Sequence, residues 1–166
     1  MTFALKDALD HYKKHAKDLI KCPNKSRRVE TVCGDLYDNG FYGFYLKKRG
    51  KGIETEYDGK SFLFECISSN GIVYFWVYFV GSPNEAKRYS VTLEFYGAKT
   101  TQIFKGQVVP IEEFWHDFVR TGKCFSISKH AFFAQFVNKD RQFEYSIEIK
   151  NLKRKLKDEN CECNKK

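Results

Sequence analysis

The sequence predicts an all-β fold, an antiparallel β-sandwich of seven or eight strands with few helices. Aromatic residues make up 17% of the 166 residues, and aromatic side chains favour the half-buried surface of a sheet. Short segments in which apolar and polar residues alternate recur along the chain, and turn signals separate them. Strands do not alternate with long helices, so a parallel βαβ arrangement is excluded.

The strands can be placed one by one from these alternations. Residues 89–96 alternate cleanly, residues 72–80 are apolar on both faces as in a central strand, and Asn70-Gly71 between two strands is a strong hairpin signal. The predicted strands are 29–33, 41–48, 61–67, 72–80, 89–96, 100–109, 124–127 and 143–149.

Helical patterns lie at the start of the chain and near its end. Apolar residues at helical spacing predict a helix over 3–20, followed by a linker over 21–28. Pro110 is suited to the first position of a second helix that reaches Val119, and a third short helix is expected over 128–136. We therefore divide the chain into a helical extension and linker (1–28), a β-sandwich (29–152) and a disordered basic tail (153–166).

The charge balance and the first residues of the chain limit the kinds of partner and the cellular compartment that can be expected. The net charge of +8 suits an acidic protein partner or nucleic acid, although it also serves solubility. The chain starts without an apolar signal segment, and its longest apolar run, residues 72–80, is too short for a membrane helix. These features predict a cytoplasmic or nuclear protein that has no membrane partner and whose six cysteines are reduced.

Several sequence blocks resemble a known family. They are FYGFYLKK at 41–48, FWVYFVGS at 75–82 with NEAK at 84–87, YSVTLEFYG at 89–97, and the later FSIS and YSIEI. In order and spacing these blocks resemble the C-terminal domain of the seven-in-absentia (SINA-type) ubiquitin ligases. The resemblance implies a TRAF-like sandwich that binds substrates or adaptors and forms homodimers. The catalytic RING of those ligases is absent from this sequence, so the resemblance implies the non-catalytic part of a ligase or a RING-less relative.

A second block resembles the end of the zinc finger that precedes the sandwich in the same ligases. ALDHYKKH at 8–15 places His11 and His15 four residues apart, on one face of a helix. Zinc would need two further ligands, and the nearest thiols are Cys22 and Cys33. We therefore expect no cofactor in this chain unless an upstream segment completes the finger, and otherwise a solvated helix face.

Catalysis finds little support in the sequence. Cys124 with His116 or His130 could form a nucleophile and base, but no surrounding motif accompanies them. Cys124 precedes Phe125 and is more typical of a buried core thiol. The chain is predicted not to be an enzyme.

The aromatic residues Tyr42, Tyr45, Tyr74, Trp76 and Tyr78 are candidates for partner contact. The outward face of the strand at 72–80 must be covered, either by the helix at 111–119 or by a second subunit. An alternative function is RNA binding, in which these aromatic rings would stack on bases between basic residues.

The edge of the sandwich gives the sharpest hypothesis. We expect residues 29–33, the shortest and most N-terminal strand, to capture an extended peptide of a partner protein through backbone groups of Val29 and Thr31. Phe41 and Tyr42 would form the floor of the groove, and the basic residues at 25–28 would favour acidic peptides. A homodimer through a sheet surface or edge is also expected, as in the resembling ligases.

Overall fold

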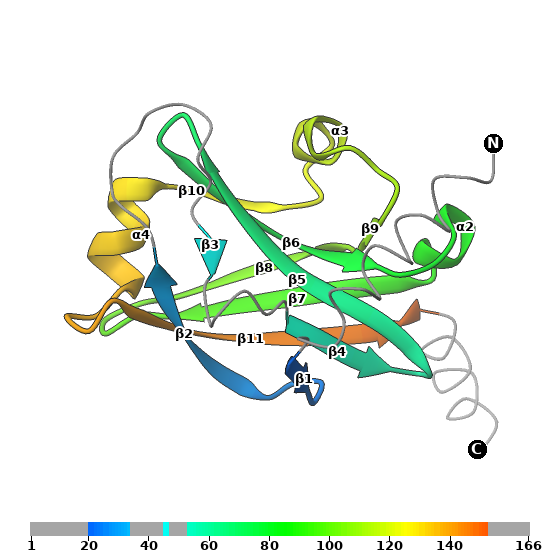
Figure 1. Cartoon of the computed structure of the whole chain (residues 1–166), viewed down its shortest axis with the longest axis horizontal. Coiled ribbons are helices and arrows are strands. Elements are labelled where there is room, and N and C mark those ends of the chain that lie inside the picture. The colour runs from blue at the N-terminus through cyan, green and yellow to red at the C-terminus, as the bar shows by residue number, and fades with distance from the viewer. Residues whose placement is uncertain (1–19, 34–44, 47–52, 153–166) are drawn as a thin grey trace, which may run out of the picture.

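The computed structural model describes residues 20–33, 45–46 and 53–152 as two β-sheets packed face to face (Figure 1). One sheet, here called sheet A, has the strand order β1-β4-β5-β6-β10, with β9 alongside β6. The other, sheet B, has the order β3-β2-β11-β7-β8. Neighbouring strands are antiparallel except in the short pairs β1–β4 and β6–β9. The predicted antiparallel β-sandwich is confirmed in its main features, and the two short parallel pairs were not predicted.

Sheet A is built around two long strands that form a hairpin. Its strands are β1 (Ile20–Cys22), β4 (Ile53–Tyr57), β5 (Lys60–Ser69), β6 (Ile72–Phe79), β9 (Val109–Pro110) and β10 (Phe125–Ser128). Asn70 and Gly71 join β5 to β6 with φ angles of 51° and 73°, the left-handed backbone that the Asn-Gly signal predicts. Asp58 and Gly59 make an equivalent turn between β4 and β5.

In sheet B the strand that comes last in the sequence lies in the middle of the sheet. Its strands are β2 (Arg27–Cys33), β3 (Tyr45–Leu46), β7 (Tyr89–Tyr96), β8 (Thr101–Gln107) and β11 (Gln142–Asn151). β11 lies between β2 and β7, so it joins β2 to the hairpin β7–β8, of which β8 is the edge strand of the sheet.

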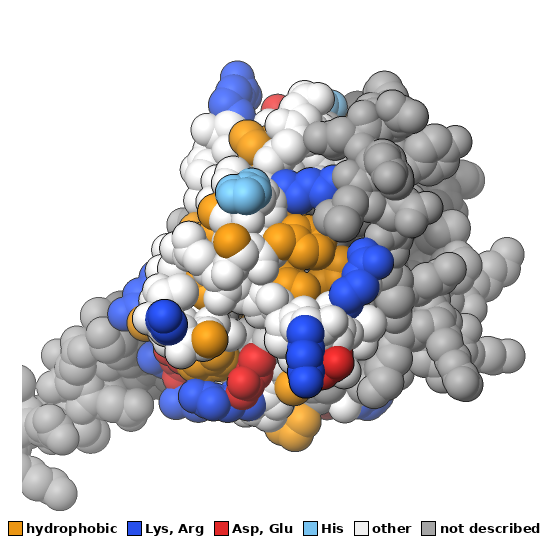
Figure 2. All heavy atoms as spheres, turned by 90° about the vertical axis from the view of Figure 1, so that its left-hand side faces the viewer, with side chains coloured by type: hydrophobic (Ala, Val, Ile, Leu, Met, Phe, Trp, Pro, Cys, Tyr) orange, Lys and Arg blue, Asp and Glu red, His pale blue; other side chains and the backbone are white. Residues whose placement is uncertain are grey.

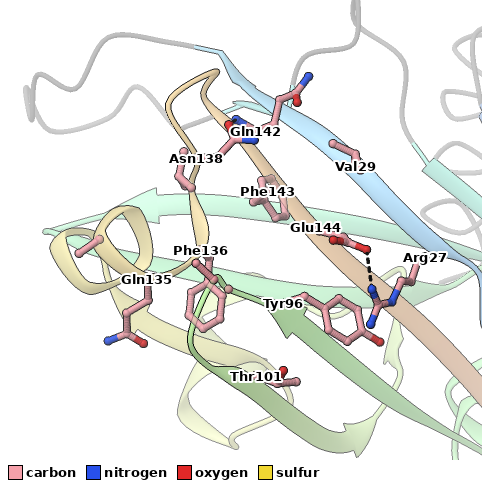
Figure 3. A pocket seen from close by; sticks show the side chains of 14 residues that line it. Arg27, Val29, Tyr96, Thr101, Gln135, Phe136, Asn138, Gln142, Phe143 and Glu144 are labelled. Atoms are coloured by element: carbon pink, nitrogen blue, oxygen red, sulfur yellow. Dashed lines mark hydrogen bonds and ion pairs between the residues drawn. The ribbon is translucent and has the colours of Figure 1, made fainter.

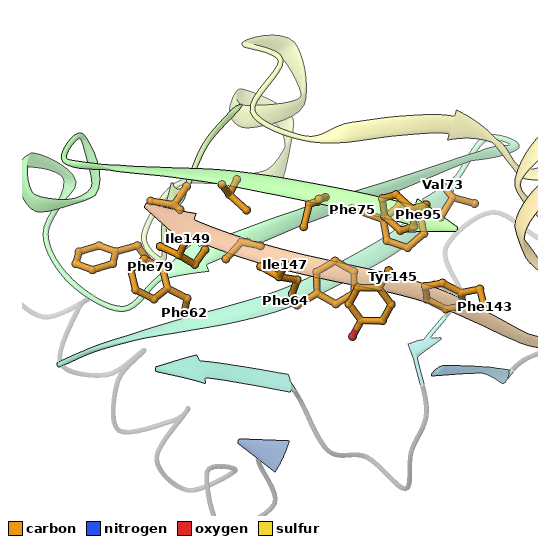
Figure 4. Packing of buried hydrophobic residues seen from close by; sticks show 14 of the residues in the cluster. Phe62, Phe64, Val73, Phe75, Phe79, Phe95, Phe143, Tyr145, Ile147 and Ile149 are labelled. Atoms are coloured by element: carbon orange, nitrogen blue, oxygen red, sulfur yellow. The ribbon is translucent and has the colours of Figure 1, made fainter. Parts of the chain in front are cut away.

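An aromatic core fills the space between the sheets (Figure 4). Ring centroids of Phe64 and Tyr145 lie 4.6 Å apart, and those of Phe75 and Phe95 lie 4.7 Å apart, each pair joining sheet A to sheet B. Aromatic pairs at this distance add to the stability gained from apolar burial.

Three short helices complete the described part of the chain. α2 (Pro83–Ala86) follows β6, with Ser82 and Glu85 forming a capping box. α3 (Trp115–Arg120) lies over the outer face of sheet A, and α4 (Lys129–Phe136) closes one end of the sandwich between β10 and β11 (Figure 1). Ser128 caps α4 by accepting a hydrogen bond from the backbone N–H of Ala131.

Several predicted boundaries were wrong. The expected linker at 21–28 instead contains most of β1 and the start of β2. Pro110 does not begin a helix, because it belongs to β9 and pairs with Phe79; the helix begins only at Trp115. The described residues form eleven strands, since three strands of two or three residues add to eight longer ones. The predicted helix at 3–20 lies outside the described residues except for Ile20, which begins β1 and is not helical. Most of the strand at 41–48 and the tail at 153–166 also lie outside them.

Candidate functional site

A pocket of about 570 Å³ lies on the outer face of sheet B, at the end closed by α4 (Figure 3). Most of its sheet residues lie at outward positions, which places it on the outer side of the sandwich, and the buried rings of Phe136 and Phe143 reach it from the core. α4 and the turns before β8 and β11 form its walls. The lining residues are Arg27, Val29, Tyr96, Gly97, Ala98, Thr101, Ala134, Gln135, Phe136, Val137, Asn138, Gln142, Phe143 and Glu144.

A cluster of three side chains from neighbouring strands lies at one end of the pocket. The guanidinium carbon of Arg27 is 4.0 Å from the centroid of the Tyr96 ring, and Nη1 of Arg27 donates to Oε1 of Glu144 at 3.1 Å. The Tyr96 hydroxyl donates to Oε2 of Glu94 at 2.6 Å and lies 3.0 Å from Oγ of Ser146. The cluster therefore holds the guanidinium of Arg27 in a fixed place on a surface that is open to solvent.

The other end of the pocket carries amide side chains. Oδ1 of Asn138 accepts hydrogen bonds from the backbone N–H groups of Asp140 and Gln142, both at 2.9 Å, which fixes the amide group. Gly97 allows α4 to approach closely, because a Cβ at this position would lie 2.2 Å from the carbonyl oxygen of Gln135. The pocket thus depends on a glycine at the turn between β7 and β8.

The predicted basic flank at 25–28 divides between two environments. Lys25 and Arg27 are exposed and form ion pairs with Glu148 and Glu144. Arg28 points inward and is 7% exposed; its Nη2 donates to Oγ1 of Thr55 at 2.7 Å and to the carbonyl of Pro23 at 3.2 Å. Only part of this flank can therefore meet a partner.

The edge of sheet B at β8 offers unpaired backbone groups. The N–H of Gly97 donates to the carbonyl of Thr100 at 2.7 Å, and Phe95 lies opposite Gln102 in the register. Because hydrogen-bonded pairs alternate along an antiparallel ladder, the N–H and C=O groups of Ile103 and Lys105 point away from β7. No strand of the described chain pairs with that side of β8.

The predicted edge at Val29 and Thr31 is placed differently than expected. Its strand, β2, has seven residues and follows β1, so it is neither the shortest nor the most N-terminal, and that reason for choosing it was wrong. The N–H of Val32 donates to the carbonyl of Arg141 at 2.7 Å, which turns the backbone groups of Val29 and Thr31 away from β11. β3 pairs with the last two residues of β2, so this edge is partly occupied.

The predicted aromatic site lies on the outer face of sheet A and is largely covered. Trp76 is 6% exposed, and its ring centroid is 4.9 Å from that of Phe118 in α3. Tyr74 and Tyr78 are half-buried beside it, and burial raises the pKa of Tyr78 to about 12. For Trp76 the structure therefore shows intramolecular cover by the helix, one of the two alternatives. Phe41 and Tyr42 lie outside the described residues, and Tyr45 belongs to β3.

The residues considered for metal binding and catalysis do not form a site in the described part of the chain. His11 and His15 lie outside it, and no three His, Cys, Asp or Glu side chains within it are grouped as metal ligands. Cys124 is 8% exposed, and burial raises its thiol pKa to about 11, so it remains protonated at neutral pH. This environment is that of a core thiol.

Comparisons with known proteins give no relative: no family model matches the chain, and no curated protein is similar to it. Within the described residues, no helix is both long enough and apolar enough to cross a membrane. The fold and the pocket define the described part of this molecule as a β-sandwich with a surface pocket and an unpaired strand edge.

Sequence reasoning found part of this site. Val29 and the basic flank were identified as partner-binding candidates, and Val29 and Arg27 both line the pocket. Tyr96, Glu144 and Asn138 were missed, because each comes from a different strand or turn and no local motif joins them. The outward polar positions of 89–96 were a usable signal, since a polar sheet face that is not covered is available to ligands.

Proposed function

We propose that this chain is a protein-interaction domain that binds an extended peptide segment by strand addition at β8. One observation carries the proposal: the backbone groups of Ile103 and Lys105 point outward from an edge strand of seven residues. Unpaired groups on an edge bind a partner strand, and side chains at alternate positions supply selectivity.

The neighbourhood of β8 suits an added strand. Phe104 on β8 and Phe125 on β10 have ring centroids 6.5 Å apart, so the edges of the two sheets face each other there. Both rings are partly buried, as is Ile127, and they offer apolar contacts to the inward side chains of a bound peptide. Ile103 is 56% exposed and offers a contact on the outer side.

The resemblance to the seven-in-absentia ligases extends this proposal. The antiparallel two-sheet arrangement supports a TRAF-like sandwich that acts as a substrate- or adaptor-binding module of a SINA-type ligase or a RING-less relative. In this role the domain is not catalytic and selects the protein that its partners act upon.

The test begins with peptides selected on the intact chain from a random displayed library. Ile103→Pro removes one outward N–H and should weaken the selected peptides at least about tenfold without unfolding the protein, because edge strands accept proline. Ile103→Thr keeps the N–H and is the matched control. Thr31→Pro makes the same change at β2, the edge predicted from the sequence.

The two proline variants separate the possible outcomes. If Thr31→Pro abolishes binding and Ile103→Pro does not, the peptide adds to β2. If both variants bind the selected peptides as the wild type does, strand addition is rejected for this domain.

RNA binding, the alternative function, is less well supported. A stacking platform needs exposed rings, but Trp76 lies under α3. A salt titration against mixed RNA separates the two functions, because binding by nonspecific charge weakens steeply with salt. Micromolar affinity for RNA at physiological salt would favour the alternative.

Self-association is a further part of the proposal. An open sandwich has edges that can pair between copies, and a homodimer through a sheet surface or edge is expected. Light scattering at tens of micromolar should give about twice 19.5 kDa. A mass of a single chain at that concentration contradicts the dimer.

A further inference from the structure

The pocket on the outer face of sheet B has features of a ligand site that are independent of strand addition. It lies across β2, β11 and β7 and is bounded by α4, whereas β8 contributes only Thr101 to it. A strand added at the edge of β8 would therefore leave the pocket open. Its volume of about 570 Å³ is in the range of sites that hold a small molecule or a few residues of a peptide.

Hydrogen-bond donors predominate among the uncommitted groups of the pocket. Oδ1 of Asn138 is occupied by two backbone N–H groups, so its NH₂ group is left to donate. Oε1 of Gln135 accepts from Gln102 at 3.5 Å, which leaves the NH₂ group of Gln135 as a second donor. Within the described part of the chain, neither NH₂ group donates to a protein atom.

Arg27 adds a positive charge at a fixed position. One of its amino groups is bonded to Glu144, and its guanidinium carbon lies over the Tyr96 ring, but the side chain is still 65% exposed and keeps further N–H donors. Glu144 is the carboxylate that lines the pocket, and Arg27 offsets its charge. A guanidinium held in this way binds a carboxylate at a small cost in side-chain entropy.

The surroundings of the pocket carry both apolar and basic groups. Val29, one of the lining residues, is 56% exposed and offers an apolar contact beside Arg27. Lys99 and Lys139 are exposed on the two turns that flank the pocket, with Asp140 beside the second. Viewed from the α4 end, Lys and Arg side chains lie on several sides of a central hydrophobic surface, and acidic side chains lie mainly in the lower part (Figure 2).

We propose that this pocket binds an acidic segment of a partner protein, in which a carboxylate side chain alternates with an apolar one. Arg27 binds the carboxylate, Val29 contacts the apolar side chain, and the NH₂ groups of Asn138 and Gln135 donate to main-chain carbonyls. Glu144 positions Arg27 and competes with the ligand for it. The net charge of +8 favours encounter with such a segment.

Two capped octapeptides test the proposal by calorimetry: GSLELESG and its uncharged counterpart GSLQLQSG. The acidic peptide should bind at least about tenfold more tightly, and Arg27→Gln should remove that difference. Glu144→Gln should strengthen binding about two- to fivefold, because it frees Arg27 for the ligand. Lys105→Gln makes the same charge change as Arg27→Gln on the same face but outside the pocket, and should change affinity less than twofold.

Any of three results would overturn the proposal: equal affinity for the two peptides, unchanged binding to Arg27→Gln, or no binding of GSLELESG at 1 mM. Displacement of the peptide by a thymidine decamer that itself requires Arg27 would assign the pocket to nucleic acid. Ile103→Pro should leave octapeptide binding unchanged, so failure of strand addition and failure of this proposal are distinguishable.

Discussion

The outer faces of the two sheets arise from the same alternation of inward and outward side chains, but the outward side chains differ in how far they are exposed to water. On sheet A the outward side chains include Leu63, Trp76 and Tyr78, and the first two are almost fully buried. On sheet B the outward side chains are mainly polar, such as Thr92, Glu94 and Glu148, and are partly exposed. Each Å² of apolar surface left in water costs about 25 cal/mol, so an apolar outward face must be covered. A polar outward face does not need such cover and remains open to ligands.

The cover of sheet A is therefore structural, and the open face of sheet B is available for recognition. α3 supplies Phe118, which is fully buried against Trp76 and Tyr78. Within the described residues, α4 approaches the outer face of sheet B at one end, and the pocket lies beside it. This difference indicates that substitutions on the two faces should affect different properties.

The largest expected effect is on the covered face. Phe118→Ala removes a fully buried ring and should lower the free energy of unfolding by about 3–5 kcal/mol, because a cavity is left between α3 and the sheet. Urea unfolding followed by tryptophan fluorescence measures it. Thr92→Ala on the open face is the control and should cost less than about 0.5 kcal/mol. Similar losses in both variants would contradict the comparison.

A smaller effect is expected where α4 meets sheet B. Gly97→Ala places a Cβ 2.2 Å from the Gln135 carbonyl, so α4 or the turn must shift, at a cost of about 1–3 kcal/mol. The same shift should weaken octapeptide binding, which Phe118→Ala should not do. Thermal unfolding and calorimetry on both variants check this, with Thr100→Ser, on the same turn but outside the pocket lining, as the control. Wild-type stability in Gly97→Ala would mean that the close approach does not matter.

Raising the pH above 10 should lower the folding stability through Tyr78 on the covered face of sheet A. Burial raises the pKa of Tyr78 from the ordinary 10.0 to about 12, so the folded state holds its proton after the unfolded state has lost it. The stability due to this group is fully present below pH 10 and falls as the pH rises from about 10 to about 12. Unfolding between pH 9 and 12 should show that loss in the wild type and a smaller one in Tyr78→Phe. Equal pH dependence would show that Tyr78 is not the group responsible.

The smallest effect is expected in acid on the open face. Burial favours a higher pKa for Glu148, but hydrogen bonds from Lys25 and Lys150 outweigh it and hold this pKa below its ordinary value of 4.5. Stability from these contacts is present above that value and is lost as the pH falls through the folded-state pKa. Partly exposed ion pairs contribute below about 1 kcal/mol, so Glu148→Gln should reduce the acid sensitivity only slightly. Carbon-13 NMR titration of the carboxyl checks the direction; a pKa above 4.5 would reverse the prediction.

How far the fold could be predicted depended on whether its signal was local. β7 has the predicted bounds, 89–96, because one buried face and one exposed face give a clean period of two. β4 was missed because its buried inward residue is a threonine, Thr55. A hairpin signal was present after it, since Asp58-Gly59 is of the same kind as Asn70-Gly71. The helix start at Pro110 was wrong because pairing with β6 overrides the local preference of proline for a helix N-terminus.

By itself, the sequence determined the class of fold, the central place of β6 and the polar character of the face that includes Glu94. These properties follow from alternation and composition, which each segment carries alone. Only the tertiary structure decided that Arg27, Tyr96 and Glu144 form one cluster and that Trp76 is covered by α3. The physical reason is that the order of strands in a sheet depends on pairing between distant segments, and that order decides which outward side chains become neighbours.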